Sequence, residues 1–161
     1  MIVLPPLFIF NDYSNLEYIK VIYSSFKNDF LDNPVYYFGE KIHCDYRLDD
    51  GKVCTFWHIV TNKLVSNNRD LDTARSARIR WPKSIIELFN NDGIKIWEKT
   101  KKGKRRIYFC LSDWSYLVIV EKRINKNPNN PSPYYLVLYT AFPIDSDGYK
   151  ENLREEFESC S

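Results

Sequence analysis

The sequence predicts an α+β fold in a single domain, residues 1–161. An N-terminal helix and hairpin precede a four-stranded antiparallel twisted sheet with helices on one side. Three observations support this prediction: a capping-box pattern opens the first helical stretch, four β-like runs follow one another in the second half, and short turns separate most of them. With 161 residues, 44% of them hydrophobic and 16% aromatic, the chain is also long enough to build one packed core.

The first expected element is a helix from about residue 15 to residue 30. Ser14 and Glu17 have the spacing of a capping box, in which each side chain binds a main-chain amide of the first turn. Apolar residues then recur at helical spacing, and Asn33-Pro34 ends the element because the residue before a proline disfavours helical geometry.

A hairpin is expected next. Short β-like runs at residues 35–38 and 42–47 lead to an Asp-Asp-Gly sequence at residues 49–51, which is typical of a tight turn. We therefore expect residues 53–60 to return as a partner strand, with His58 on one of its faces.

The middle of the chain is expected to be irregular. Residues 61–80 are rich in Asn, Asp and Arg, which predicts a long loop with one helical turn near residues 71–77. Pro82 suits the first turn of a helix that runs to about residue 90.

The strongest β signal follows, as an antiparallel meander. A Pro- and Asn-rich loop precedes the last strand, and a polar helix over residues 148–158 finishes the chain. The expected strands are residues 94–99, 106–111, 116–122 and 134–141.

Positive charge is concentrated in the middle of the chain. Residues 60–106 carry 13 basic and 5 acidic side chains, whereas residues 1–59 and 145–161 are net acidic. A focused positive region favours a polyanionic partner such as nucleic acid. The alternative is a solvated face whose charge is neutralised by acidic groups elsewhere in the fold.

The sequence offers no sign of export, membrane insertion or a cofactor. Its four irregularly spaced cysteines are typical of buried thiols in a reducing compartment, and no signal peptide or membrane-length apolar run is visible. We expect a cytoplasmic protein without a membrane partner.

Four side chains of the predicted hairpin could bind zinc: His43, Cys44, Cys54 and His58. Because adjacent strand residues point to opposite faces, His43 and Cys44 cannot both reach one ion, so we expect no metal and no cofactor.

His58 is the candidate catalyst, because a histidine can take a proton from one oxygen and return it to another. The alternative is a structural histidine. Guanidinium groups downstream can bind phosphate oxygens and stabilise a phosphorane-like transition state, or they can form salt bridges with Asp70 and Asp72 in a solvated loop. The candidate arginines are Arg69, Arg75 and Arg78 as catalytic groups and Arg80 as a substrate-binding group.

Two further segments are candidates for binding. Near the end of the last strand, the Thr140 hydroxyl can bind a phosphate or a ribose oxygen, and the Tyr139 ring can stack on a base. The alternative for both is an ordinary aromatic strand. A basic turn can follow a nucleic-acid backbone, and its residues are Lys101, Lys102 and Lys104.

Several segments between residues 50 and 145 resemble a family of small bacterial and phage proteins in the barnase, EndoU, colicin and RelE-like nuclease group. The resemblance implies two N-terminal helices, a four-stranded antiparallel sheet and RNA cleavage without metal. The chain departs from that pattern in having one clear helix before the first hairpin, and no second histidine placed for a two-histidine mechanism. The matching segments are Asp-Gly-Lys at 50–52, Thr-Phe-Trp-His-Ile at 55–59, Arg-Ile-Arg-Trp-Pro at 78–82, Ile-Lys-Ile-Trp-Glu at 94–98 and Tyr-Thr-Ala-Phe-Pro at 139–143.

On this resemblance we expect an endoribonuclease, linked to a phage or to a toxin–antitoxin pair. The ribose 2′-hydroxyl attacks its own phosphate, His58 is the general acid and base, one or more of Arg69, Arg75 and Arg78 bind the phosphate, and Thr140 positions it. The expected partners are RNA and an inhibitor or antitoxin protein. The alternative is a non-catalytic module that binds nucleic acid or protein through the same basic loop.

Overall fold

The computed structural model describes residues 2–10, 14–65 and 68–160, with only the main chain described over residues 63–65 and 68–70. In chain order, its elements are α1 (Asn15–Phe26), a π-helical extension (Lys27–Asp32), β1 (Tyr36–Tyr37), β2 (Glu40–His43), β3 (Leu48–Asp49), β4 (Lys52–Val53), α2 (Cys54–Val60), β5 (Thr61–Val65), β6 (Asn68–Leu71), α3 (Thr73–Ala77), α4 (Trp81–Glu87), β7 (Ile94–Lys101), β8 (Lys104–Leu111), β9 (Tyr116–Ile124), β10 (Tyr134–Pro143) and α5 (Asp147–Ser159).

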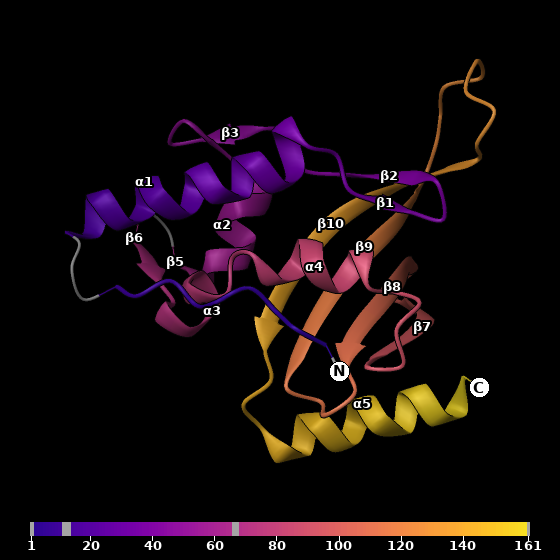
Figure 1. The fold of residues 1–161 in the computed structure, drawn as a ribbon. Helices are drawn as coiled ribbons and strands as arrows, with labels where there is room; N and C mark the ends of the chain where they lie inside the picture. Colours follow the sequence, from indigo (N-terminus) through magenta and orange to yellow (C-terminus); the bar gives the residue numbers. More distant parts are fainter. Residues whose placement is uncertain (1, 11–13, 66–67, 161) are drawn as a thin grey trace.

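The described strands form a six-stranded sheet of order β1-β2-β10-β9-β8-β7, together with the small hairpins β3-β4 and β5-β6. The antiparallel meander β7 to β10 was predicted, and it forms four adjacent strands of the sheet, with β7 at one edge. The prediction of only four strands was wrong, because β2 adds to β10 in parallel and β1 pairs with β2. Figure 1 shows β1 and β2 running beside β10.

Each face of the sheet has its own core, because successive strand residues point to opposite sides. On one face, Phe109, Val118 and Leu138 pack with residues of the helices that precede the sheet. On the other, Tyr108 and Ile119 pack with residues that include Leu153 of α5. The prediction that helices lie on one side therefore fails for α5, which lies apart from the other helices in Figure 1.

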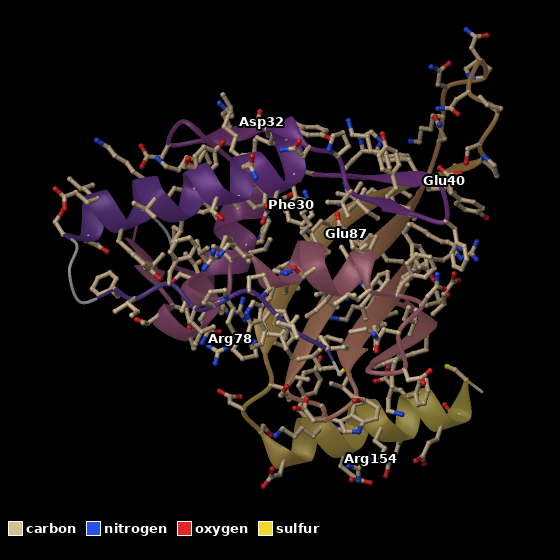
Figure 2. All side chains as sticks on the ribbon, in the orientation of Figure 1. Phe30, Asp32, Glu40, Arg78, Glu87 and Arg154 are labelled. Carbon is tan, nitrogen blue, oxygen red and sulfur yellow. The ribbon has the colours of Figure 1, made fainter. Side chains whose placement is uncertain are left out.

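The N-terminal helix was predicted correctly, and it closes over the larger core. The Ser14 hydroxyl accepts from the Glu17 amide at 3.3 Å, and the Glu17 carboxylate accepts from the Ser14 amide at 3.4 Å, which completes the capping box. The helix continues through a wider π-helical turn to Asp32. This extension buries Phe30, which lies between α1 and α4 in Figure 2.

The expected strand over residues 53–60 is instead the helix α2. Its side chains are almost all buried, among them Phe56, Trp57 and Ile59. A short segment that is apolar on every side carries no periodicity, so its sequence does not distinguish a buried strand from a buried helix. The turn before it was correct: Asp50 and Gly51 both have positive φ, at 51° and 75°, but the strands it joins have only two residues each.

The stretch expected as a long loop is more ordered than predicted. It contains the hairpin β5-β6, which was not predicted, and the helix α3, which matches the expected helical turn. The expected helix with Pro82 in its first turn is α4, which runs from Trp81 to Glu87 and so ends before the expected residue 90.

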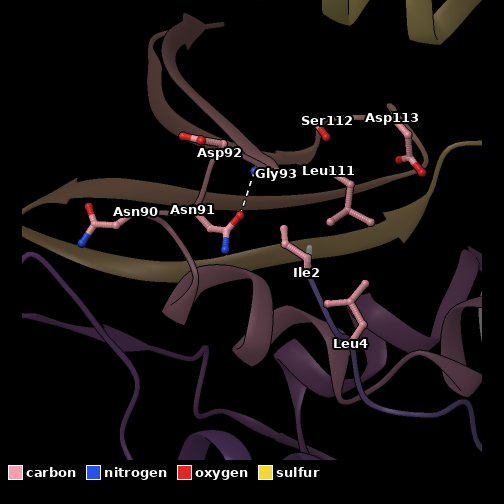
Figure 3. Close-up of a pocket in the computed structure, with 9 residues that line it drawn as sticks. All are labelled: Ile2, Leu4, Asn90, Asn91, Asp92, Gly93, Leu111, Ser112 and Asp113. Atoms are coloured by element: carbon pink, nitrogen blue, oxygen red, sulfur yellow. Dashed lines mark hydrogen bonds between the residues drawn. The ribbon is translucent and has the colours of Figure 1, made fainter.

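The N-terminal segment is fastened across α3 and α4. The Phe8 amide donates to the Ala77 carbonyl at 3.0 Å, and Trp81 Nε1 donates to the Pro5 carbonyl at 2.9 Å. Ile2 lies against Gly93, where a Cβ atom would stand only 2.3 Å from the Ile2 side chain. A hollow of about 730 Å³ borders this end of the segment (Figure 3).

Candidate functional site

His58 lies in the last turn of α2, and its peptide group is held from two sides. The Thr140 hydroxyl donates to the His58 carbonyl oxygen at 3.1 Å, and the Arg75 guanidinium donates to the same oxygen at 3.3 Å. The half-buried imidazole lies near the Tyr139 ring, with ring centres 6.3 Å apart and an interplanar angle of 25°. Three of the residues predicted as catalytic therefore meet, but they meet at the main chain of His58.

This arrangement caps the helix. The last carbonyl groups of a helix have no partner within it, and cations near this end interact favourably with its dipole. Arg75 also donates to the Thr61 carbonyl at 3.1 Å, so one guanidinium serves two carbonyl groups there. Burial lowers the pKa of Arg75, and the charge of Asp72 partly offsets that effect. Arg75 and Thr140 thus join α2 to α3 and β10, a role that the sequence did not predict.

The other described arginines of the series also bind main-chain carbonyl groups. Arg78 donates to Ala74 at 2.8 Å. Arg80 donates to Pro6 and lies 4.3 Å from the centre of the Phe8 ring. These bonds differ from both interpretations of the sequence, which expected the arginines to bind phosphate or to pair with Asp70 and Asp72. The prediction for Arg69 falls on a side chain outside those that the structure describes.

Arg75 and Arg78 share a pocket of about 340 Å³ with Asp72, Phe142 and Tyr149. His58 and Thr140 do not line it, so the structure does not bring the imidazole and these two guanidinium groups into one cavity. Tyr116 does not line the pocket, and its fully buried hydroxyl has no hydrogen-bond partner among the described residues. Burial raises the pKa of Tyr116, while the charges of Arg78 and Arg75 act in the opposite direction.

The predicted basic turn lies away from His58. Lys101, Lys102 and Lys104 are exposed at the β7-β8 turn, where Lys102 and Gly103 have positive φ. Strand register aligns Thr140 with Ile119 and then with Tyr108, four residues and about 13 Å along β8 from the turn. The turn also lies two strands away from β10.

A charged row on the sheet was missed by the sequence analysis. The Glu121 carboxylate, whose side chain is only 3% exposed, accepts from Arg106 Nε at 3.2 Å and from an Arg123 Nη atom at 2.9 Å. Burial opposes the charge of Arg106, but the hydrogen bond and charge of Glu121 prevail and raise the pKa of Arg106. The carboxylate therefore holds two cations on the face that α5 partly covers.

Arg106 connects this row to His58 through an aromatic ring. Its guanidinium carbon lies 4.5 Å from the centre of the Tyr139 ring, which also packs against the His58 imidazole. A similar pair lies further along β10, where Arg75 is 5.0 Å from the centre of Phe142. Three half-buried rings on β10 each have an arginine as neighbour, and we call these six residues the β10 row. The pairs are Tyr135 with Arg123, which lies opposite it in the strand register, Tyr139 with Arg106, and Phe142 with Arg75.

One sequence signal could have located the charged part of this row. Arg106 and Glu121 border the apolar runs of two consecutive strands, and β8-β9 pairing sets them directly opposite each other. Two opposite charges at matched positions of neighbouring strands favour a cross-strand ion pair. The sequence analysis instead grouped the arginines that are close together along the chain.

Among the described residues, no group of three or more His, Cys, Asp or Glu side chains could hold a metal ion. All four cysteines are free thiols, and burial raises the pKa of Cys44 and of Cys110 to about 12. No helix in the described part of the chain has the length and apolar character needed to cross a membrane.

No protein-family model matches the chain, and comparisons with curated proteins and with solved structures give no significant match.

Proposed function

We propose that the protein is a metal-independent endoribonuclease, linked to a phage or a toxin–antitoxin pair, that binds single-stranded RNA along the β10 row and cleaves it beside His58. The observation that carries the proposal is the shared contact at Tyr139. Its ring lies beside a histidine from α2 and an arginine from β8, which brings a proton acceptor and a permanent cation close to one aromatic ring.

The β10 row suits an RNA strand because it repeats one pairing of groups. Aromatic rings give sequence-tolerant stacking for bases, and the guanidinium groups of Arg106, beside Tyr139, and of Arg123, opposite Tyr135, can bind phosphates. The cations beside Tyr139 also disfavour a bound metal ion, since the charge of Glu121 is already matched by Arg106 and Arg123. RNA rather than DNA is the substrate because the reaction uses the ribose 2′-hydroxyl.

In the proposed reaction, His58 accepts the proton of the 2′-hydroxyl as the 2′-oxygen forms a bond to phosphorus. The bond from phosphorus to the 5′-oxygen breaks, and His58 returns the proton to that oxygen. The products are a 2′,3′-cyclic phosphate and a 5′-hydroxyl. Arg106 stabilises the charge of the transition state, while Glu121 orients Arg106. Arg75 and Thr140 act indirectly, by fixing the peptide group of His58.

A second candidate is a non-catalytic module that binds RNA. It is favoured by the bonds of Arg75 and Thr140 to the His58 carbonyl, which give these residues a packing role without any substrate. In that case the β10 row binds RNA, and the imidazole only packs against Tyr139. An inhibitor or antitoxin protein belongs to the catalytic candidate alone, because a free intracellular ribonuclease harms its host.

The test is cleavage of total RNA in EDTA by the wild-type protein, His58→Gln and His43→Gln. The second histidine is the comparison, because it lies in β2, where its ring contacts Tyr46 and lies edge-on to Tyr135 of the β10 row, away from Tyr139. We expect cleavage by the wild type and His43→Gln, cyclic phosphate ends, and loss of cleavage in His58→Gln. Equal cleavage by all three proteins would remove His58 from the reaction. Binding of RNA without cleavage by the wild type would favour the second candidate.

A further inference from the structure

A second basic pocket lies where β8, β9 and β10 meet, at the end of the sheet near the loop of residues 125–133. Its volume is about 430 Å³, and it draws on the start of β8, the end of β9 and the start of β10. The side chains that matter for its chemistry are Lys104, Arg105, Lys122, Arg123, Lys126 and Tyr134.

The pocket holds more positive charge than its own carboxylates neutralise. Arg105 and Lys122 share Glu98, at 3.5 Å and 2.8 Å, and Arg123 binds Glu121. Lys104 and Lys126 are exposed, and among the described residues neither has a carboxylate within ion-pair distance. A concave surface with surplus cations concentrates anions.

The walls of the pocket also provide an aromatic surface. The Arg105 guanidinium lies 4.8 Å from the centre of the Tyr134 ring, and the Lys122 ammonium lies 5.9 Å from the same centre. Cations close to an aromatic ring are a pattern of single-stranded nucleic-acid sites, where a base stacks while its phosphate is bound.

The pocket is continuous with the β10 row, because Tyr135 and Arg123 belong to both. Tyr135 and Tyr139 are four residues apart on β10, a distance of about 13 Å along the strand. At ~3.4 Å per stacked nucleotide, this distance corresponds to about four nucleotides, and to fewer in an extended strand.

We propose that this pocket is a phosphate-binding subsite that holds the RNA strand a few nucleotides away from His58. The inference rests on the proposed RNA substrate, but it does not require cleavage. The ligand is the backbone of a flexible single strand, bound mainly by Lys104 and Lys126 as unpaired cations and by stacking on Tyr134.

The experiment measures binding of a labelled oligouridylate of about 12 nucleotides as a function of salt, in a His58→Gln background that prevents cleavage. The variant Lys104→Gln/Lys126→Gln is compared with Lys20→Gln/Lys27→Gln, which removes two exposed lysines from the α1 region at the same cost in net charge. Each lost phosphate contact lowers the slope of log affinity against log salt by about 0.7. We expect a slope smaller by about 1.4 and affinity on the order of tenfold weaker at ~0.1 M salt for the pocket variant alone.

Equal affinities and slopes for the two double variants would overturn the subsite, whether or not the wild-type protein cleaves RNA. A mononucleotide that binds as tightly as the oligouridylate, with the same sensitivity to Lys104→Gln/Lys126→Gln, would overturn strand binding in favour of a nucleotide pocket. Failure of the wild type to cleave, with the lysine effect intact, would overturn the proposed nuclease and support the subsite.

Discussion

The Thr140 hydroxyl donates a hydrogen bond of 3.1 Å to the main-chain carbonyl of His58, across 82 residues of sequence. The bond involves the main chain of His58 and not its imidazole. Strand β10 therefore fixes the position of His58 without a bond to the ring nitrogens. In the proposed reaction, Thr140 is therefore a positioning residue. Thr140 stabilises the end of α2, where His58, the proposed general base, is located.

Replacing Thr140 by valine keeps the side-chain shape and removes the hydrogen bond. The His58 carbonyl keeps its bond from Arg75, so we expect the free energy of unfolding to fall by about 1 kcal/mol rather than by the larger amount expected for an unpaired buried group. Urea denaturation measures the change, and Thr140→Ser is the control that retains the hydroxyl. A serine variant as unstable as the valine variant would assign the loss to the methyl group.

Replacing Arg75 by methionine removes both of its bonds to the end of α2. We expect a loss of about 1–3 kcal/mol in the free energy of unfolding, together with faster amide hydrogen exchange in α2. Arg78→Met is the comparison, because Arg78 serves the Ala74 carbonyl, within its own helical segment. Unchanged exchange in α2 for Arg75→Met would show that the helix end is held by Thr140 alone.

Replacing Glu121 by glutamine leaves two guanidinium groups without their buried counter-charge. Removing one partner of a buried ion pair is strongly destabilising, so we expect a loss of about 3–5 kcal/mol. Adding Arg106→Met to Glu121→Gln removes one of the unmatched charges and recovers part of the loss. A double-mutant cycle by thermal or urea unfolding measures this coupling, and additive effects would contradict the ion pair.

Stability depends on pH through His43. Burial, followed by the charge of Lys41, lowers the pKa of His43 below its usual 6.5. Because the folded protein binds a proton less readily than the unfolded chain, this contribution to stability is present above pH ~6.5 and is lost as the pH falls through the folded-state pKa. Unfolding free energies measured at several pH values below ~6.5 should decline less in His43→Gln than in the wild type. A parallel decline in both proteins would attribute the effect to other groups.

The meander was predictable from sequence because β8, β9 and β10 contain apolar runs rich in β-branched and aromatic residues, and the first two turns contain Gly or Asp. The helix α2 was not, because Thr55 to Val60 are buried on nearly every side, and burial in the tertiary structure decides between helix and strand there. The addition of β2 to β10 was also unpredictable, since two pairs of residues far apart in sequence create it.

The candidate site was only partly predictable for a similar reason. Sequence analysis selected His58, Arg75 and Thr140, and these residues do come together. Their contact at a main-chain carbonyl depends on where α2 ends, which the sequence did not reveal. Arg106 and Glu121 were missed because strand register brings them together over fifteen residues of sequence.

The packing of α2 on β10 also affects whether β10 can pair with a strand of another molecule. Strand β2 pairs with β10 only at Leu136 and Val137, and beyond them α2 covers the edge, with hydroxyl bonds from Thr55 to the Leu138 carbonyl and from Thr140 to α2. An uncovered strand edge is a template for pairing with another chain. By covering this edge, α2, the helix that contains His58, also limits pairing of β10 with a strand of another molecule. We expect changes that loosen α2 to expose the β10 edge and to favour association between molecules.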